Sequence, residues 1–512
     1  MTKINKNEDN QSVDEKKDNK ASAICKVKNY INLETTQNTI YDFIQSLLLV
    51  VMIVVPFVVI KYGQRYYIDA KVTLLYAAAF IIFVAMMFSK RIKIRREIEV
   101  ALIFLGTICI SAIFSSFSST AIWGSIERRE GCVMFFVYII LFIAASSFFS
   151  VDKRTINVML IAASLMSCYT ILQMFKIDPL QEYLYGKIVT PDTSIATIGN
   201  SNFVSSYLSM FLVIALGLYI YRKKLIYLLY SGIIFLGFLA ARTRGGWITF
   251  VLVAVVALIF IIKSKEKLIR AGIVFVTFAI LAFSLDVATD GMIYGRAKLS
   301  NIFERTNTES SEVTENVQEE SKSSNEESSN DENTNNNQDK IESDNSSLSN
   351  EQTNNNEESN SSIKLLGSFS SRANILKITF KAFLDKPLLG EGPDTLGQRL
   401  KRDYSSEYYN HVKLYNEGID KAHNEYLEYA TSCSIFTLIA YLVLVGMILF
   451  KLFKERKNDK KVILFLTILM YLSQAFFNIS VIMVAPVFWI IMGYAVKVIY
   501  NDDNGNCEML EE

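Results

Sequence analysis

One of only two histidines in the 512-residue chain lies in the segment "DKAHNEYLEYA", from Asp420 to Ala430. The segment falls where a long polar stretch gives way to an apolar run. Asp420 is a favourable N-cap, so the pattern predicts that His423 lies in the first turn of a helix. The positive end of a helix disfavours a protonated imidazole, and a neutral histidine is a competent general base at neutral pH. The alternative is a surface or packing histidine.

Three other stretches contain arginines that could bind a phosphate group beside this candidate base. These stretches are "AARTRGGWITF" with Arg242 and Arg244, "WGSIERREG" with Arg128 and Arg129, and "SSRANILKITFKAFLDKP" with Arg372. Arginine recognises phosphate through two parallel hydrogen bonds. Several arginines on one face beside a candidate base favour a phosphate-bearing ligand. The alternative for each one is snorkelling or contact with lipid head groups.

The stretch after Arg372 predicts a short helix with one apolar face, lying on the membrane or roofing the spans. The apolar residues with helical spacing are Ile375, Ile378, Ala382 and Phe383. Ser370 or Ser371 is expected to cap this helix, and Pro387 follows its end. The turn "LLGEGPDTLG" comes next, with Gly390 and Gly392. Such a turn can aim backbone N–H groups at an anion, and a turn without a ligand is the alternative.

Apolar runs of roughly 17 to 22 residues recur along the chain, each long enough to cross about 30 Å of hydrocarbon. Charges are nearly absent inside them, so the sequence predicts an all-α polytopic protein embedded in a lipid bilayer. We count about twelve runs, centred near Val50, Phe80, Gly106, Ile140, Leu165, Phe211, Phe235, Ala254, Val276, Tyr441, Leu469 and Ile490.

Basic clusters between the runs predict the orientation of the spans. With about twelve spans, the clusters "SKRIKIRRE", "DKR", "YRKK", "KSKEKLIR" and "KLFKERKNDKK" all fall on one side. That side is expected to be the cytoplasmic face of the plasma membrane, with both termini. The predicted organisation is a cytoplasmic tail (1–40), spans one to nine (41–286), a large extracytoplasmic loop (287–425), spans ten to twelve (426–500) and a cytoplasmic tail (501–512).

The composition of the large loop changes along its length. Residues 306–362 are almost entirely Ser, Asn, Glu, Asp, Gln and Thr, so we expect a disordered insert without chemistry. Residues 363–425 are expected to form the catalytic part of the loop. The formal net charge of the chain, +1, argues against a nucleic-acid partner. Six cysteines without paired spacing predict neither a disulfide framework nor a metal site, and no cofactor is expected.

Together these stretches resemble the O-antigen ligase and O-antigen polymerase superfamily of polytopic membrane glycosyltransferases. "TRGGW" from Thr243 is similar to the family's Ser/Thr-Arg-Gly element, and "HNEYLEYA" is similar to its His-Asn-x-x-Leu element. "SRANILKITFKAFLDKPLLGEGPDTL" resembles the family's loop segment with its arginine and Gly-x-Gly turn. "TIGNSNFVSSYL" and "ERREG" resemble two further elements, with Ser201 where many relatives have proline. The resemblance covers most of residues 40–500, and the polar insert departs from it.

The resemblance implies transfer of a glycan from a polyprenyl-diphosphate carrier to an acceptor hydroxyl on the outer face, in cell-surface polysaccharide assembly. It implies that His423 is the general base and that Arg244 and Arg372 neutralise the leaving diphosphate, with inversion and without a metal. The acceptor is expected to be a glycan, a lipid or a protein. Further substrate contacts are expected from Arg242, Arg128, Arg129, Asn200, Asn202, Gly390, Gly392 and Asn424.

Two other classes of protein stay open from the residues alone. One is a polysaccharide or lipid transporter or flippase, and the other is a non-catalytic envelope assembly protein whose outer loop binds a partner. Transporters usually place ionisable or broken-helix sites near the bilayer midplane, whereas the polar residues here crowd one surface. Asn200, Asn202, Gln173 and Gln474 are the polar residues that keep a transporter in consideration.

Overall fold

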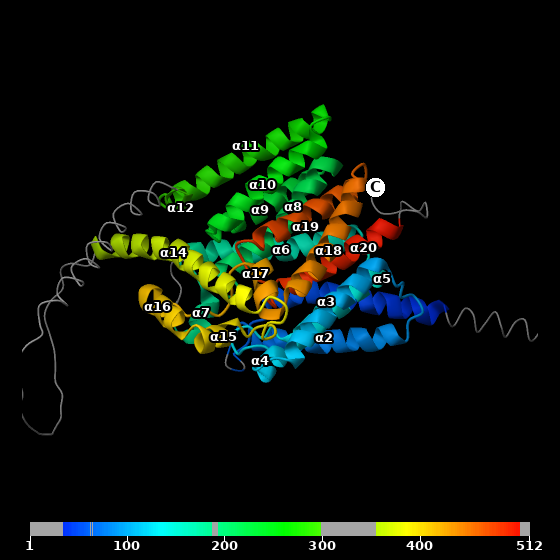
Figure 1. Ribbon diagram of the computed structural model, residues 1–512. Helices are drawn as coiled ribbons and strands as arrows, with labels where there is room; N and C mark the ends of the chain where they lie inside the picture. Colours follow the sequence, from blue (N-terminus) through cyan, green and yellow to red (C-terminus); the bar gives the residue numbers. More distant parts are fainter. Residues whose placement is uncertain (1–33, 62, 64, 187–192, 298–354, 502–512) are drawn as a thin grey trace, which may run out of the picture.

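The chain forms a bundle of helices in a computed structural model (Figure 1), which describes residues 34–61, 63, 65–186, 193–297 and 355–501, with side chains from Ser370 onward in the last range. All regular elements in these ranges are helical. A helix lies at every position where the sequence predicts a span. These helices are Glu34–Phe57, α2 (Asp69–Met87), α3 (Arg96–Ile113), α5 (Cys132–Phe148), α6 (Lys153–Met174), α8 (Ser201–Arg222), α9 (Leu225–Ala240), α10 (Arg244–Ile261), α11 (Lys265–Ala288), α18 (Ile435–Lys454), α19 (Asp459–Gln474) and α20 (Ala485–Asn501).

Seven of these helices are long and apolar enough to cross a membrane, and further apolar helices are shorter. The prediction of a polytopic helical membrane protein is therefore confirmed. The count of about twelve spans and the side that each loop faces stay predictions. Further helices connect or cover the spans: α4 (Ser118–Trp123), α7 (Pro179–Tyr185), α12 (Met292–Ala297), α14 (Asn355–Asp385), α15 (Leu396–Asp403), α16 (Ser405–Tyr415) and α17 (Glu425–Glu428).

Aromatic side chains fill the centre of the bundle. Trp489 of α20 is 1% exposed and stacks beside Tyr138 of α5, with ring centroids 6.4 Å apart. Phe104 of α3 packs against the same indole at 5.8 Å. Gly493 lets α20 approach α5 closely, because a Cβ at this position would clash with the carbonyl of Phe142. Helices α3, α5 and α20 therefore form one tightly packed core.

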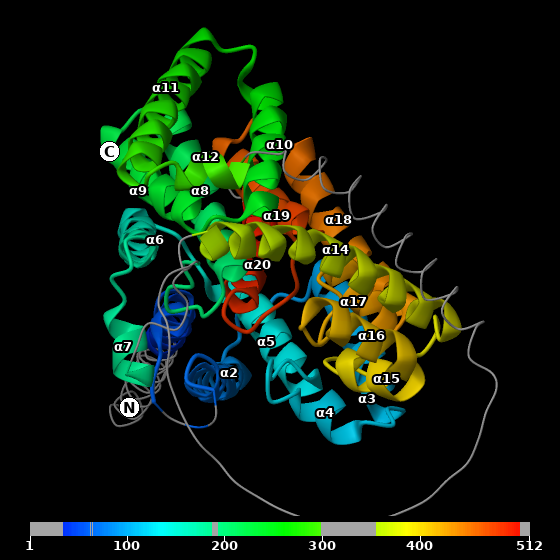
Figure 2. The same ribbon diagram turned by 90° about the vertical axis from the view of Figure 1, so that its left-hand side faces the viewer.

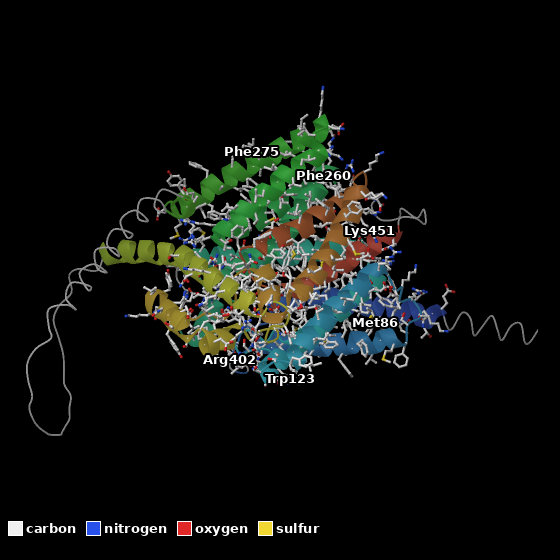
Figure 3. All side chains as sticks on the ribbon, viewed as in Figure 1. Met86, Trp123, Phe260, Phe275, Arg402 and Lys451 are labelled. Atoms are coloured by element: carbon white, nitrogen blue, oxygen red, sulfur yellow. The ribbon has the colours of Figure 1, made fainter. Side chains whose placement is uncertain are left out.

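Helices α10 and α11 lie at the periphery of this core. Only 22% and 11% of their apolar windows are buried inside the protein, compared with 83% for α8. Phe278 of α11 stacks on Phe235 of α9 with ring centroids 3.9 Å apart, whereas Phe275 points outward (Figure 3). The exposed apolar surface of α10 and α11 suits contact with lipid.

The basic loops gather at one end of the bundle. Lys267 lies 3.5 Å from Asp459, and Lys497 of α20 donates a 2.7 Å hydrogen bond to the Tyr41 hydroxyl of the first helix. Figure 3 shows Met86 and Lys451 toward this end, away from Trp123 and Arg402. These basic loops belong to the clusters from which the sequence predicts the orientation of the spans.

The other end of the bundle is covered by the loop helices α14, α15 and α16, and Figure 2 shows α14 crossing over it. These helices share a small core of their own. Its buried members include Ile375, Ile378, Ala382, Leu396, Leu400 and Tyr408. The predicted helix with one apolar face is thus confirmed, and that face packs within the loop.

Two expectations about α14 are wrong. The helix begins at Asn355, so Ser370 and Ser371 lie inside it and do not cap it. Helical structure therefore includes the end of the insert that we expected to be disordered, residues 355–362. The rest of the predicted insert, 306–354, lies outside the described residues, as do residues 1–33 of the predicted tail. Ser371 contacts His411 and Glu417 instead, because its position on α14 faces α16.

Candidate active site

His423 lies immediately before a helix, and not in its first turn. Asn424 is the N-cap of α17, since its Oδ1 accepts a 2.9 Å hydrogen bond from the backbone N–H of Leu427. The expectation that Asp420 caps this helix is therefore wrong. His423 has φ of +52°, in the left-handed region that few residues other than glycine adopt. This backbone presents the half-buried imidazole at the point where the loop meets the bundle.

The charges around His423 favour its neutral form. Burial lowers the pKa of the imidazole, and the positive charge of Arg372 lowers it further. Asp420 and Glu417 act in the opposite direction without reversing the shift. An imidazole with a pKa below the usual value is neutral at pH 7 and has a free nitrogen to accept a proton.

Arg128 holds the segment that precedes His423. Its Nε and Nη2 lie 2.7 and 2.6 Å from the same Oδ2 of Asp420. Arg129 is also engaged, since its Nε lies 3.4 Å from Asp69 at the start of α2. Both residues were expected to bind substrate. Their carboxylate partners indicate that they position the loops around His423.

Arg242, Arg244 and Arg296 converge near the start of α10. Arg244 Nε donates a 2.7 Å hydrogen bond to the carbonyl of Arg296, and Arg296 Nε donates a 3.1 Å bond to the carbonyl of Arg242. Burial lowers the pKa of Arg296 to about 10, and Arg244, Arg242 and Arg372 contribute to the shift. The four guanidinium groups thus form a concentrated positive region. Arg296, in the short helix α12, was missed because nothing in its local sequence marks it.

A polar cavity of about 220 Å³ lies beside this positive region, between α8, α10, α14 and α19. Arg372, Asn202 and Thr243 are among the residues that line it. Ser205 Oγ, Thr243 Oγ1 and Arg244 Nη2 are buried without a hydrogen-bond partner among the described residues. Buried polar atoms are nearly always paired in proteins, so a group of unpaired ones around a cavity is typical of a site that receives a ligand.

Residues 229–442 match a family model described as O-antigen ligase. This part of the chain is similar to the O-antigen ligase family. The match includes the segments around Arg244, Arg372, Gly390 and His423, and it confirms the resemblance seen in the sequence. The elements around Glu127 and Thr197 lie outside the matched residues. No curated protein matches the chain.

The Gly-x-Gly turn has a structural role. Gly390 donates its backbone N–H to the carbonyl of Cys433 at 2.6 Å, and Gly392 donates to the carbonyl of Ser432 at 2.8 Å. A Cβ on Gly390 would clash with the carbonyl of Ser432, which explains the need for glycine. The expectation that these N–H groups face an anion is wrong, because η2, the π-helical turn Tyr429–Cys433, occupies them.

Two of the three asparagines expected to bind substrate are helix caps. Asn200 caps α8 by accepting a 2.9 Å hydrogen bond from the N–H of Asn202. Asn424 caps α17, and its Nδ2 also donates to the carbonyl of Phe476 at 3.2 Å. Asn202 is the one that lines the polar cavity.

A buried ion network on the other side of His423 was also missed from the sequence. Lys421 Nζ lies 3.3 Å from Asp394, 3.4 Å from Glu130 and 3.7 Å from Glu428. Although burial opposes its charge, these carboxylates raise the pKa of Lys421 above its ordinary value. Glu130 also accepts a 2.6 Å hydrogen bond from Ser480. The network ties the loop to the segments that lead into α5 and α20.

Glu425 is a second titratable group close to His423. Burial, reinforced by Glu130, raises the pKa of its carboxyl to about 7, and tyrosine hydroxyls oppose the shift. Those hydroxyls belong to Tyr429, Tyr441 and Tyr471, each 3.1 Å from a Glu425 oxygen. With both oxygens already accepting hydrogen bonds, Glu425 is less suited than His423 to take a proton from a substrate.

Proposed function

We propose that the chain transfers a glycan from a polyprenyl-diphosphate carrier to an acceptor hydroxyl, with His423 as the general base and Arg244 and Arg372 at the diphosphate. The observation that carries the proposal is the polar cavity. Arg372 lines it, unpaired buried polar atoms surround it, and the charge of Arg372 acts on His423. One residue therefore links the anion-binding region to the candidate base.

The diphosphate supplies the negative charge that this region lacks. Arg372 makes no hydrogen bond or ion pair with any described residue, and Arg244 Nη2 is unpaired within the same part of the chain. A diphosphate can accept two parallel hydrogen bonds from each guanidinium. The same contacts strengthen as the carbon–oxygen bond breaks and charge builds on the leaving group. Arg296, which bonds to the backbone carbonyl of Arg242, adds positive charge to the same region.

His423 acts on the acceptor. Its unprotonated nitrogen takes the proton of the acceptor hydroxyl as the oxygen attacks the anomeric carbon. The new carbon–oxygen bond forms while the bond to the diphosphate breaks, and the electron pair leaves with the carrier lipid diphosphate. A single displacement of this kind inverts the anomeric centre and needs no metal. A glycan, a lipid or a protein can provide the hydroxyl.

The polar residues within the spans give no support to a transporter. Gln474 accepts a 2.6 Å hydrogen bond from Ser206 and donates a 2.9 Å bond to Ser209. Gln173 donates a 2.7 Å bond to Asp178 and accepts a 2.6 Å bond from the N–H of Ala196. Both side chains are thus satisfied within the protein, whereas Ser205 Oγ and Thr243 Oγ1 at the polar cavity are unpaired among the described residues.

Turnover and binding measured on the purified protein test the proposal. His423→Ala should lower turnover of a polyprenyl-diphosphate glycan by roughly 10²- to 10⁴-fold, the usual contribution of a general base. The affinity for the donor should stay nearly unchanged, because the arginines remain. Lys457→Ala, an exposed change at the opposite end of the bundle, is the control. Full turnover by His423→Ala would falsify the assignment of His423, and an intact wild type without turnover would favour a transporter or an assembly protein.

A further inference from the structure

A second polar cavity lies at the opposite end of the bundle from His423. It is open to solvent, spans about 1000 Å³ and is lined by basic residues from separate elements: Lys90, Arg91, Lys93, Arg95 and Lys497. Helix α3 begins at Arg96, so its positive end also faces this region. The cations lie in the loop between α2 and α3 and near the end of α20, which the fold brings together.

The cations of this basic cavity that have hydrogen-bond partners bond to neutral groups. Arg95 Nη1 donates a 2.8 Å hydrogen bond to the carbonyl of Val496, and Lys497 Nζ donates to the carbonyl of Phe149 at 2.9 Å. Lys93 is exposed and makes no hydrogen bond or ion pair with a described residue. The nearby Glu97 is paired with Lys451 at 2.6 Å. Among the described residues, no carboxylate forms an ion pair with any cation that lines the cavity.

A buried hydroxyl at the same place also lacks a partner. Ser147 lines the cavity, and its Oγ is buried without a hydrogen bond among the described residues. A cluster of basic residues at a membrane surface is by itself only a topology signal. An unpaired hydroxyl inside a cavity whose cations lack carboxylate partners indicates more, because it offers a hydrogen bond to an anion that the cations attract.

A largely apolar cavity of about 800 Å³, with Arg222, Asp459 and Lys460 as its charged lining residues, begins two residues along the chain from Ser147 of the basic one. Phe149 lines it and contacts Tyr494 edge-on, with ring centroids 5.7 Å apart. The carbonyl of the same Phe149 accepts the hydrogen bond from Lys497. One residue thus separates a positive cavity from an apolar one, which is the arrangement that an amphipathic anion requires.

We propose that the basic cavity binds the phosphate of an anionic phospholipid, with an acyl chain of that lipid in the neighbouring apolar cavity. The lipid comes from the leaflet at this end of the bundle, which the basic loops predict to be cytoplasmic. A free phosphate ion shares the head-group chemistry but has no use for the apolar cavity. The proposal does not depend on the transfer reaction, because the two sites lie at opposite ends of the helices.

Lipid affinity of the purified full-length protein in detergent tests this site. Phosphatidylglycerol should bind at least about tenfold more tightly than phosphatidylcholine with the same acyl chains, since only the former carries net negative charge. Lys93→Gln should weaken phosphatidylglycerol binding about fivefold, the effect of one basic residue near an anionic head group. Lys497→Gln should weaken phosphatidylglycerol binding further. If Lys497→Gln fails to fold, Lys93→Gln still tests the site, because that substitution breaks no internal contact. Lys457→Gln is the matched control on an exposed loop at the same end.

Several results would overturn the proposal. Equal affinity for the two lipids would remove the role of the head-group charge. Displacement of phosphatidylglycerol by an equal concentration of inorganic phosphate would identify a free anion as the occupant. An unchanged affinity in Lys93→Gln, or an equal loss in Lys457→Gln, would show that the cavity itself does not recognise the lipid.

Discussion

Lys421 and Arg372 are cations in the same loop, yet their surroundings differ completely. Lys421 is buried with three carboxylates between 3.3 and 3.7 Å away. Arg372 lines a cavity beside other arginines and has no carboxylate within ion-pair distance in the described part of the chain. The difference separates two functions. The charges of the first region balance one another and hold the loop in place, whereas those of the second leave room for the anion that we propose it binds.

Removal of Lys421 should have the largest effect on stability. Lys421→Met leaves Asp394, Glu130 and Glu428 buried without a counter-charge, which usually costs about 3–5 kcal/mol. We expect a loss of that size in the free energy of unfolding, measured by denaturant in detergent. Lys386→Met is the control, because Lys386 is half-exposed and Glu391 keeps its second partner, Arg402, at 2.8 Å. Equal stability of Lys421→Met and the wild type would mean that the network does not hold the loop.

Removal of Arg244 should weaken donor binding without unfolding the protein. A charge-assisted hydrogen bond contributes about 1.5–3 kcal/mol, so Arg244→Ala should raise the Kd for a polyprenyl-diphosphate glycan roughly 10- to 150-fold. Arg244→Lys should restore only part of the affinity, because an ammonium cannot make two parallel bonds to phosphate. Arg129→Ala is the control, since Arg129 pairs with Asp69. A larger loss in Arg129→Ala than in Arg244→Ala would reverse the roles given to the two arginines.

The protonation of His423 offers a smaller but directional test. Arg372 lowers its pKa and Asp420 raises it. Arg372→Gln should therefore move the pKa upward, and Asp420→Asn should move it downward. The pH dependence of histidine modification by diethyl pyrocarbonate reports the neutral form, and the other histidine, His411, is fully buried. The pH at which modification of His423 is half-maximal should rise in Arg372→Gln and fall in Asp420→Asn. Shifts in the same direction would contradict the charge arrangement.

Deletion of residues 306–354 should have the smallest effect. Their composition cannot form a packed core, and the deletion leaves α14 intact. Turnover and donor affinity should equal those of the full chain. A deletion variant that reaches the membrane but has no turnover would give this segment a role in the reaction.

The positions of the membrane helices could be predicted from the sequence, because apolar runs are local signals. Arg244 and Arg372 could also be named, since both stand in recognisable segments. The partners of Lys421 could not be predicted, because Glu130 lies 291 residues away along the chain. The sequence also led to two wrong predictions, that Asp420 caps the helix after His423 and that the Gly390 turn offers N–H groups to an anion. Asn424 is an equally good cap four residues later, and the carbonyls of η2 accept the N–H groups of the turn.

The exposure of α11 connects the active site to the thickness of the bilayer. Its 24 residues rise about 36 Å, more than the roughly 30 Å of a hydrocarbon core. Few internal contacts fix its tilt, so a thicker or thinner membrane changes the angle of α11 at little cost. Arg296 lies in α12, the next helix after α11, and bonds to the backbone of Arg242. If the proposed function holds, membrane thickness therefore changes the position of a guanidinium beside the proposed diphosphate site, and the rate of transfer should depend on acyl-chain length.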